Sequence, residues 1–258
     1  MPYATHSGVR TYYEVEGRGA PLMLHIGFLG RLDDWRRNDT PYAAALNERY
    51  RLILVDPRGQ GRSDKPLEPT AYTKRRRARD MVAVLDDLGI ARTHFWGYSL
   101  GGYVGFALAA HAPERLISLI AGGAHPFVEA TDPTRHVFYK WLQGGIDHFV
   151  ASYEDAYAPL PAEARKRWLA EDPAALSAAW LAPDQAVDLD SALPGMHVPA
   201  LLYVGGEDDP GPVERAASIM PDATFLRLDG LNHGQAFRRS DLVLPHAHAF
   251  LHRVTGSP

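Results

Sequence analysis

The sequence predicts an α/β fold, in which a mostly parallel β-sheet is covered by helices on both faces and carries a small helical insertion. Short apolar runs typical of buried strands alternate with segments of helical periodicity, which is the pattern of such a sheet. The stretch 126–194 breaks this rhythm, since it lacks a strand-like run, is rich in Ala, Trp and Tyr, and contains several prolines. We therefore expect a core formed by 1–125 and 195–258, interrupted by a helical cap at 126–194.

The first half of the chain predicts three strands and two helices. Val9–Val15 alternates apolar and polar residues, which indicates a half-exposed or edge strand. Leu22–Ile26 and Leu52–Val55 are almost continuously apolar and predict buried strands. Helices are expected at 41–50 and 78–88.

The same alternation continues on both sides of the insertion. Four further strands are predicted, at Thr93–Trp96, Leu116–Ile120, Pro199–Val204 and Ala223–Leu228. A buried helix is expected at 103–110, and a closing helix at 242–254. With 258 residues, 46% of them hydrophobic, the chain is large enough for one sizeable core.

The motif Gly97-Tyr98-Ser99-Leu100-Gly101 lies where a predicted strand turns into a predicted helix. This context is that of a nucleophile elbow, in which a strained turn exposes the serine hydroxyl and the flanking glycines let neighbouring backbone pass. Ser99 also precedes a helix N-terminus, which favours developing negative charge. Ser99 is therefore the candidate nucleophile.

A serine hydroxyl needs a base within hydrogen-bond reach and a carboxylate that orients the base. Two loops after late strands supply these groups: Gly205–Pro210 contains Asp208 and Asp209, and the next contains His233. In open α/β sheets, ligands bind at the carboxyl ends of strands. The order serine, acid, histidine is the one expected with a nucleophile elbow.

With these motifs, the sequence resembles the α/β-hydrolase fold family, in its branch of cap-bearing serine hydrolases similar to esterases and lactonases. The resemblance covers nearly the whole chain and is weakest in the insertion. It implies that Ser99 is the nucleophile and His233 the base. The family acid closes a Gly-x-x-Asp loop, which both Asp208 and Asp209 satisfy, and Asp209 is preferred because Pro210 follows it.

The resemblance also implies an oxyanion hole made by two backbone N–H groups, those of Leu100 and Phe28. The assignment of Phe28 rests on the pair Gly27-Phe28. The family commonly has His-Gly before the donor, whereas this chain has His25-Ile26-Gly27, so its histidine is displaced by one position.

Composition argues against several other functions. The net charge of −4 gives no overall basic field for nucleic acid, and the basic run Lys74–Arg79 is interpreted as a solvated helix face. The chain has no cysteine, and its 12 histidines do not form a metal motif. Met1–His6 does not resemble a signal peptide, and no apolar run is long enough to span a membrane, so we expect a cytoplasmic protein.

The sequence thus predicts a cofactor-free, metal-free serine hydrolase that cleaves a small, apolar carboxylic ester or lactone. The same residues would serve a thioesterase, an amidase, a carbon–carbon bond hydrolase or a perhydrolase. A receptor-like protein that keeps the fold and binds a ligand without turnover is the alternative from another class. No nucleic-acid or membrane partner is expected, and the oligomeric state is left open.

Overall fold

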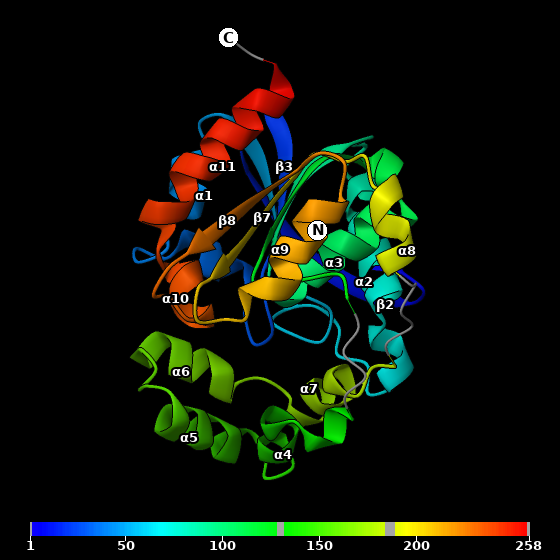
Figure 1. Ribbon diagram of the computed structural model, residues 1–258. Coiled ribbons are helices and arrows are strands. Elements are labelled where there is room, and N and C mark those ends of the chain that lie inside the picture. Colours follow the sequence, from blue (N-terminus) through cyan, green and yellow to red (C-terminus); the bar gives the residue numbers. More distant parts are fainter. Residues whose placement is uncertain (1, 128–131, 184–188, 257–258) are drawn as a thin grey trace.

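A computed structural model of the chain describes residues 2–127, 132–183 and 189–256. An eight-stranded sheet with the order β1-β2-β4-β3-β5-β6-β7-β8 runs through the molecule. The pairs β1/β2 and β2/β4 are antiparallel, and all other neighbours are parallel. Helices cover both faces, and a separate layer of helices lies below the carboxyl ends of the strands in Figure 1. The predicted fold class is confirmed.

The strands match the predicted ones closely, with one addition at the edge. They are β1 (Tyr3–His6), β2 (Val9–Gly17), β3 (Ala20–His25), β4 (Tyr50–Val55), β5 (Thr93–Tyr98), β6 (Leu116–Gly122), β7 (Ala200–Gly205) and β8 (Ala223–Leu228). The predicted strand at Val9–Val15 is half-exposed but does not form the edge, because β1 pairs with its outer side. Ser7 and Gly8, both with positive φ (51° and 76°), make the tight turn of this hairpin.

The core helices are α1 (Tyr42–Leu46), α2 (Lys74–Asp87), α3 (Leu100–His111), α9 (Pro210–Ile219), α10 (His233–Arg238) and α11 (Ser240–Thr255). Side chains of α2, α3 and α9 pack on one face of the sheet, around Met81, Leu108 and Val213. Those of α1 and α11 pack on the other, around Leu46 and Val243. The sheet therefore lies between two apolar layers, and only its strand ends are free to carry a site.

The basic run at the start of α2 is not wholly a solvated face. Arg75, Arg76 and Arg79 are exposed, as predicted. Arg77 is buried instead, and its guanidinium donates to the backbone oxygens of Tyr72 and Arg58. Arg77 thus holds the backbone of these core loops and does not face solvent.

The described part of 126–194 contains helices and no strand. Its α-helices are α4 (Val137–Leu142), α5 (Ile146–Ala156), α6 (Ala162–Leu169), α7 (Pro173–Trp180) and α8 (Leu189–Ala192). Helices α4 to α7 form the layer below the strand ends in Figure 1, which we call the cap, whereas α8 lies beside the core helices.

Apolar and ionic contacts attach the cap to the core. Leu29, in the loop after β3, belongs to the same buried apolar cluster as Phe149 and Leu176 of the cap. The Glu171 carboxylate, almost fully buried, accepts from the guanidinium of Arg31 (Nε to Oε1, 2.7 Å) and from the N–H of Gly61 (3.1 Å). The cap is therefore fastened to the loops that follow β3 and β4. None of the described helices is both long and apolar enough to cross a bilayer.

One buried histidine predicts how stability depends on pH. His94, on β5, is fully buried with its Nδ1 2.7 Å from Oγ of Ser118, and burial lowers its pKa to about 4. The unfolded chain takes up this proton near pH 6.5, whereas the folded protein does not. Folding stability should therefore fall as the pH drops below about 6.5, by about 1.4 kcal/mol per pH unit for this group, until about pH 4.

Urea unfolding of the wild type and of His94→Asn at pH 7 and pH 5 measures this contribution. Because asparagine does not titrate, we expect the loss of stability between the two pH values to be about 2 kcal/mol smaller in the variant. An equal loss in both proteins would show that His94 is not the group responsible.

Candidate active site

Ser99 lies at a strained turn between β5 and α3. Its backbone has φ 54° and ψ −119°, a conformation that residues other than glycine rarely adopt. The N–H of Ser99 donates to the carbonyl of Gly122 at the end of β6 (2.7 Å), and its own carbonyl accepts from Gly102 (2.8 Å). The side chain is half-buried at the carboxyl edge of the sheet. The structure thus places Ser99 as a nucleophile elbow requires.

Two glycines permit this turn because strand and helix backbones touch there. A Cβ on Gly97 would lie 2.1 Å from the carbonyl oxygen of Gly101, and one on Gly101 would lie 2.0 Å from the carbonyl oxygen of His25. A side chain at Gly97 would force β5 away from α3, and one at Gly101 would force α3 away from β3. The Gly-x-Ser-x-Gly spacing is therefore a packing requirement of the turn.

The loop after β3 lies directly against the serine. A Cβ on Gly27 would be 3.0 Å from Cβ of Ser99 and 3.4 Å from its Oγ. The next N–H in this loop is that of Phe28, and the first N–H of α3 is that of Leu100. Both predicted oxyanion donors thus belong to backbone that adjoins Ser99, despite the displaced histidine.

That histidine, His25, is buried inside the core. Its Nδ1 lies 2.8 Å from the carbonyl oxygen of Ile26, and burial lowers its pKa to about 3, so it stays neutral. A carbonyl only accepts hydrogen bonds, so Nδ1 carries the proton. His25 thus supports the loop backbone from inside the core.

His233, the first residue of α10, lies on the same edge as Ser99. A Cβ on Gly123 would lie 2.9 Å from Cε1 of His233. Gly123 directly follows Gly122, whose carbonyl accepts from the N–H of Ser99. The hydroxyl of Tyr98 donates to the backbone carbonyl of His233. Burial raises the pKa of Tyr98 well above its ordinary value, so this hydroxyl remains a donor. The residue next to the serine therefore also holds the backbone of the histidine.

The carboxylate that contacts the histidine is Asp208 and not the preferred Asp209. Oδ2 of Asp208 lies 2.5 Å from Nδ1 of His233. Asp209 is not the partner of His233, for a physical reason. Pro210 begins helix α9, which leaves Asp209 as the exposed residue before the helix, with φ 42°. The proline thus marks a helix start and carries no information about the acid.

Backbone hydrogen bonds join the acid loop to the histidine loop. Gly206 N–H donates to the carbonyl of Leu228 (2.8 Å), and Glu207 N–H to that of Leu231 (3.1 Å). Asp208 N–H closes a turn on Gly205 (3.0 Å). The carboxylate and the imidazole are therefore held by the paired ends of β7 and β8.

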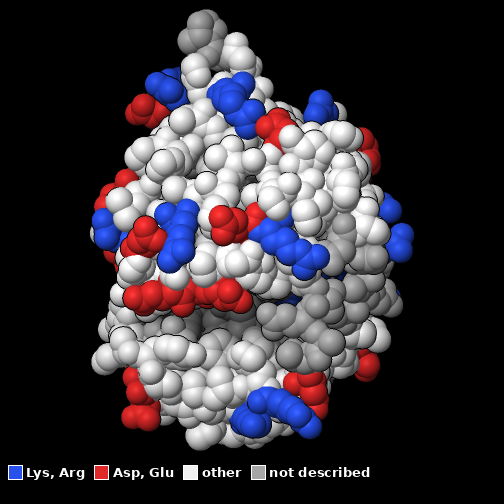
Figure 2. Space-filling model, in the orientation of Figure 1, with Lys and Arg blue, Asp and Glu red and all other residues white. Residues whose placement is uncertain are grey.

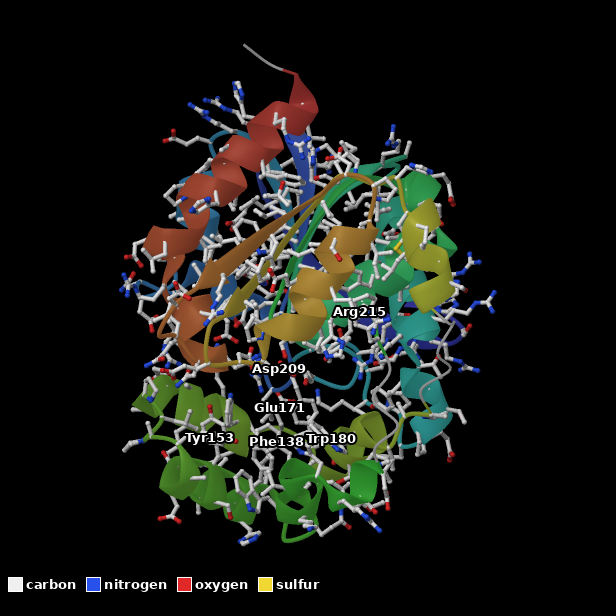
Figure 3. The ribbon with its side chains drawn as sticks, viewed as in Figure 1. Phe138, Tyr153, Glu171, Trp180, Asp209 and Arg215 are labelled. Atoms are coloured by element: carbon white, nitrogen blue, oxygen red, sulfur yellow. The ribbon has the colours of Figure 1, made fainter. Side chains whose placement is uncertain are left out.

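The surface is hollowed between core and cap, with acidic residues along the core side of the hollow (Figure 2). Asp209 lies on that side, whereas Tyr153, Phe138 and Trp180 lie across the cap (Figure 3). The ring of Trp180 packs edge-on against Phe28 (centroids 5.3 Å apart) and lies 5.7 Å from the ring of Phe138. An apolar wall thus extends from the loop beside Ser99 into the cap.

Among the residues that the structure describes, no group of three His, Cys, Asp or Glu side chains could hold a metal ion. What the site does present is a hydroxyl on a strained turn, an imidazole held by a carboxylate, and the N–H groups of Phe28 and Leu100 in the adjoining backbone. Such a set can take a proton from the hydroxyl and stabilise an oxyanion, which defines the class of hydrolases built on a nucleophile elbow.

Comparison with known proteins agrees with this class. A sequence model of the alpha/beta hydrolase fold matches residues 20–151, and the chain belongs to this family. It is 30% identical over 245 residues to the putative carbamate hydrolase RutD of Stutzerimonas stutzeri, covering 86% of this chain and 88% of that one.

Solved structures give the same family. The enol-lactonase of Burkholderia xenovorans LB400 is 27% identical, with a TM-score of 0.83 over 97% of this chain and 99% of the other. A thermophilic esterase of Thermogutta terrifontis shares the fold, with a TM-score of 0.82 and 23% identity over 98% of this chain and 97% of the other.

Sequence reasoning missed two residues that hold the site. In the sequence, Tyr98 is a variable position of the Gly-x-Ser-x-Gly motif, and Gln60 is one residue of a turn-rich loop. Both act through hydrogen bonds to backbone that is distant in the sequence, 135 positions away for Tyr98 and 31 positions away for Gln60. Such contacts leave no local pattern in the sequence.

Substituting the two neighbouring acids separately tests the corrected assignment. Asp208→Asn should lower kcat of hydrolysis by about 10⁴-fold, because an amide cannot hold the tautomer of His233 or stabilise its imidazolium as a carboxylate does. Asp209→Asn is the matched control and should leave kcat within about threefold of wild type, as expected for an exposed residue outside the hydrogen-bonded pair. Steady-state kinetics of both variants checks this, and the reverse ranking would restore Asp209 as the acid.

Proposed function

We propose that the protein is a serine hydrolase that cleaves a carboxylic ester or lactone through an acyl-enzyme on Ser99. The observation that carries the proposal is the strained turn at Ser99 on the same sheet edge as the hydrogen-bonded pair of Asp208 and His233. The 27% identity to an enol-lactonase over almost the whole chain supports the substrate class.

In the proposed mechanism, His233 takes the proton of Ser99 as the hydroxyl oxygen attacks the substrate carbonyl. Asp208 orients His233 and stabilises the imidazolium that forms. The N–H groups of Phe28 and Leu100 bind the tetrahedral oxyanion. Collapse breaks the ester bond, and His233 gives its proton to the leaving alkoxide. Water activated by His233 then hydrolyses the acyl-enzyme, and no step uses a cofactor.

The cap favours an apolar acyl group. The half-buried rings of Phe28, Phe138 and Trp180 form a continuous wall beside the proposed oxyanion donor. Burial of an acyl chain against them contributes roughly 0.8 kcal/mol per methylene. Short polar esters should therefore be poorer substrates than medium-chain ones.

A carbamate is the second candidate substrate. Relatives at about 30% identity are named putative carbamate hydrolases, and Ser99 would attack a carbamate carbonyl by the same steps. Loss of the alcohol would then leave a carbamoyl-enzyme, whereas loss of the amine would leave an alkoxycarbonyl-enzyme.

The decisive experiment measures hydrolysis of p-nitrophenyl esters from acetate to decanoate, of a simple lactone and of an aryl carbamate by the wild type and by Ser99→Ala. Loss of the nucleophile should lower kcat by about 10⁶-fold. A variant rate within tenfold of the wild type would refute the proposed function. The ranking of the three carbonyl classes separates ester or lactone hydrolysis from carbamate hydrolysis.

A further inference from the structure

The loop that carries Phe28 has no regular secondary structure, yet its backbone is tightly fixed. Gly30 N–H donates to the carbonyl of Gly27 (3.1 Å), which closes a turn over residues 27–30. Leu29, inside this turn, has φ 63°, a left-handed conformation that its branched side chain disfavours. Such a turn persists only where its surroundings hold it.

One buried side chain makes three contacts with this turn. The amide oxygen of Gln60 accepts from the N–H of Leu29 (2.7 Å). Its amide nitrogen donates to the carbonyl oxygens of Gly27 (3.1 Å) and Gly30 (3.2 Å). Gln60 itself is only 1% exposed, so water does not replace these bonds.

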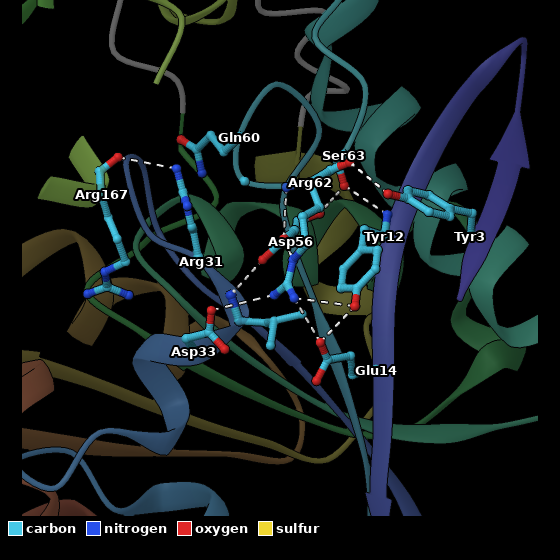
Figure 4. Close-up of polar contacts among 12 residues, drawn as sticks. Tyr3, Tyr12, Glu14, Arg31, Asp33, Asp56, Gln60, Arg62, Ser63 and Arg167 are labelled. Atoms are coloured by element: carbon cyan, nitrogen blue, oxygen red, sulfur yellow. Dashed lines mark hydrogen bonds and ion pairs between the residues drawn. The ribbon is translucent and has the colours of Figure 1, made fainter. Parts of the chain in front are cut away.

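The backbone of the loop after β4 directs the Gln60 side chain toward the turn at 27–30. Gly59 and Gly61, on either side, have positive φ (86° and 56°). The N–H of Gln60 donates to the carbonyl of Pro57, and the carbonyl of Gln60 accepts from the N–H of Ser63. The side chain is thereby left to reach the loop after β3. Figure 4 shows Gln60 beside the polar contacts through which Asp56, Arg62 and Ser63 fasten this loop.

The bond to Gly27 determines the direction of the neighbouring donor. A trans peptide is planar, so its C=O and N–H point in opposite directions. The carbonyl of Gly27 and the N–H of Phe28 belong to one peptide. Gln60 and Gly30 hold that carbonyl on one side, and the N–H of Phe28 is consequently fixed on the other.

We propose that Gln60 is a positioning residue for the oxyanion hole: it orients the N–H of Phe28 by holding the peptide of Gly27 and the strained backbone of Leu29. This inference rests on the proposed function, since it concerns the same hydroxyl and the same oxyanion. Gln60 touches no reacting atom. Its contribution should therefore appear in the transition state and not in the binding of substrate.

The test compares Gln60→Met with Ser63→Ala. Methionine has similar length and no amide, so it removes all three contacts with little change in volume. Ser63 is a matched control in the same loop: it is also buried, and its hydroxyl bonds to the carbonyl of Asp56 (2.7 Å) and the N–H of Tyr12 (2.9 Å), away from the turn at 27–30.

Three readouts are taken on p-nitrophenyl butyrate: kcat, KM, and the inhibition constant of an alkyl trifluoromethyl ketone, which adds to the serine and leaves an oxyanion in the hole. For Gln60→Met we expect kcat to fall about 10- to 100-fold, somewhat less than the loss of a whole oxyanion donor. KM should stay within twofold, and ketone affinity should fall by the same factor as kcat. Ser63→Ala should keep kcat and ketone affinity within about threefold even if its Tm drops.

A second variant, Gln60→Asn, keeps an amide but shortens the reach by one methylene. It should likewise lower kcat and leave KM within twofold. If Gln60→Met does not fold, Gln60→Asn still tests the inference. Normal kcat and ketone affinity in a folded Gln60 variant would overturn the inference while Ser99→Ala still upholds the proposed function. If Ser99→Ala retains wild-type turnover, the proposed function fails, and the inference with it.

Discussion

The contact between bare backbones at the junction of β5 and α3 is the constraint on which the site depends. Gly97 and Gly101 have no room for a Cβ, so strand and helix approach until the residue between them must adopt a positive φ. This turn lifts the Ser99 side chain out of the sheet and sets the first N–H groups of α3 beside it. The same turn therefore positions both the Ser99 hydroxyl and the N–H of Leu100, one of the two proposed oxyanion donors.

The other groups are placed by the same parallel sheet. The loops after β3, β7 and β8 leave at the edge where Ser99 lies, and backbone hydrogen bonds join the loop after β7 to the loop after β8. Side chains add the cross-links that the sheet cannot make: Tyr98 holds the backbone of His233, and Gln60 holds the turn that contains Phe28. The backbone at the site is thus held in place by side-chain hydrogen bonds before any reaction begins.

These facts explain what the sequence could and could not predict. Most strands, helices α2, α3 and α11 and the elbow follow from apolar periodicity and glycine spacing, which are local properties, and they lie within a few residues of their predicted bounds. Helices α9 and α10 were not predicted. The choice between Asp208 and Asp209 depends on how a loop turns before α9, and the proline that suggested Asp209 serves the helix instead. The role of Gln60 depends on a contact between two loops that are 31 positions apart. Neither is a local property.

In the proposed mechanism, the loop between β3 and the cap would couple turnover to substrate choice. The N–H of Phe28 is the proposed oxyanion donor, and the ring of the same residue packs on Trp180 of the cap. Leu29 joins the apolar cluster of Phe149 and Leu176. A substrate that fills the space beneath the cap would therefore press on the turn that carries the proposed oxyanion donor. Because Gln60 holds that turn from the core side, the proposed mechanism makes acyl size and reaction rate depend on one short turn held between two layers.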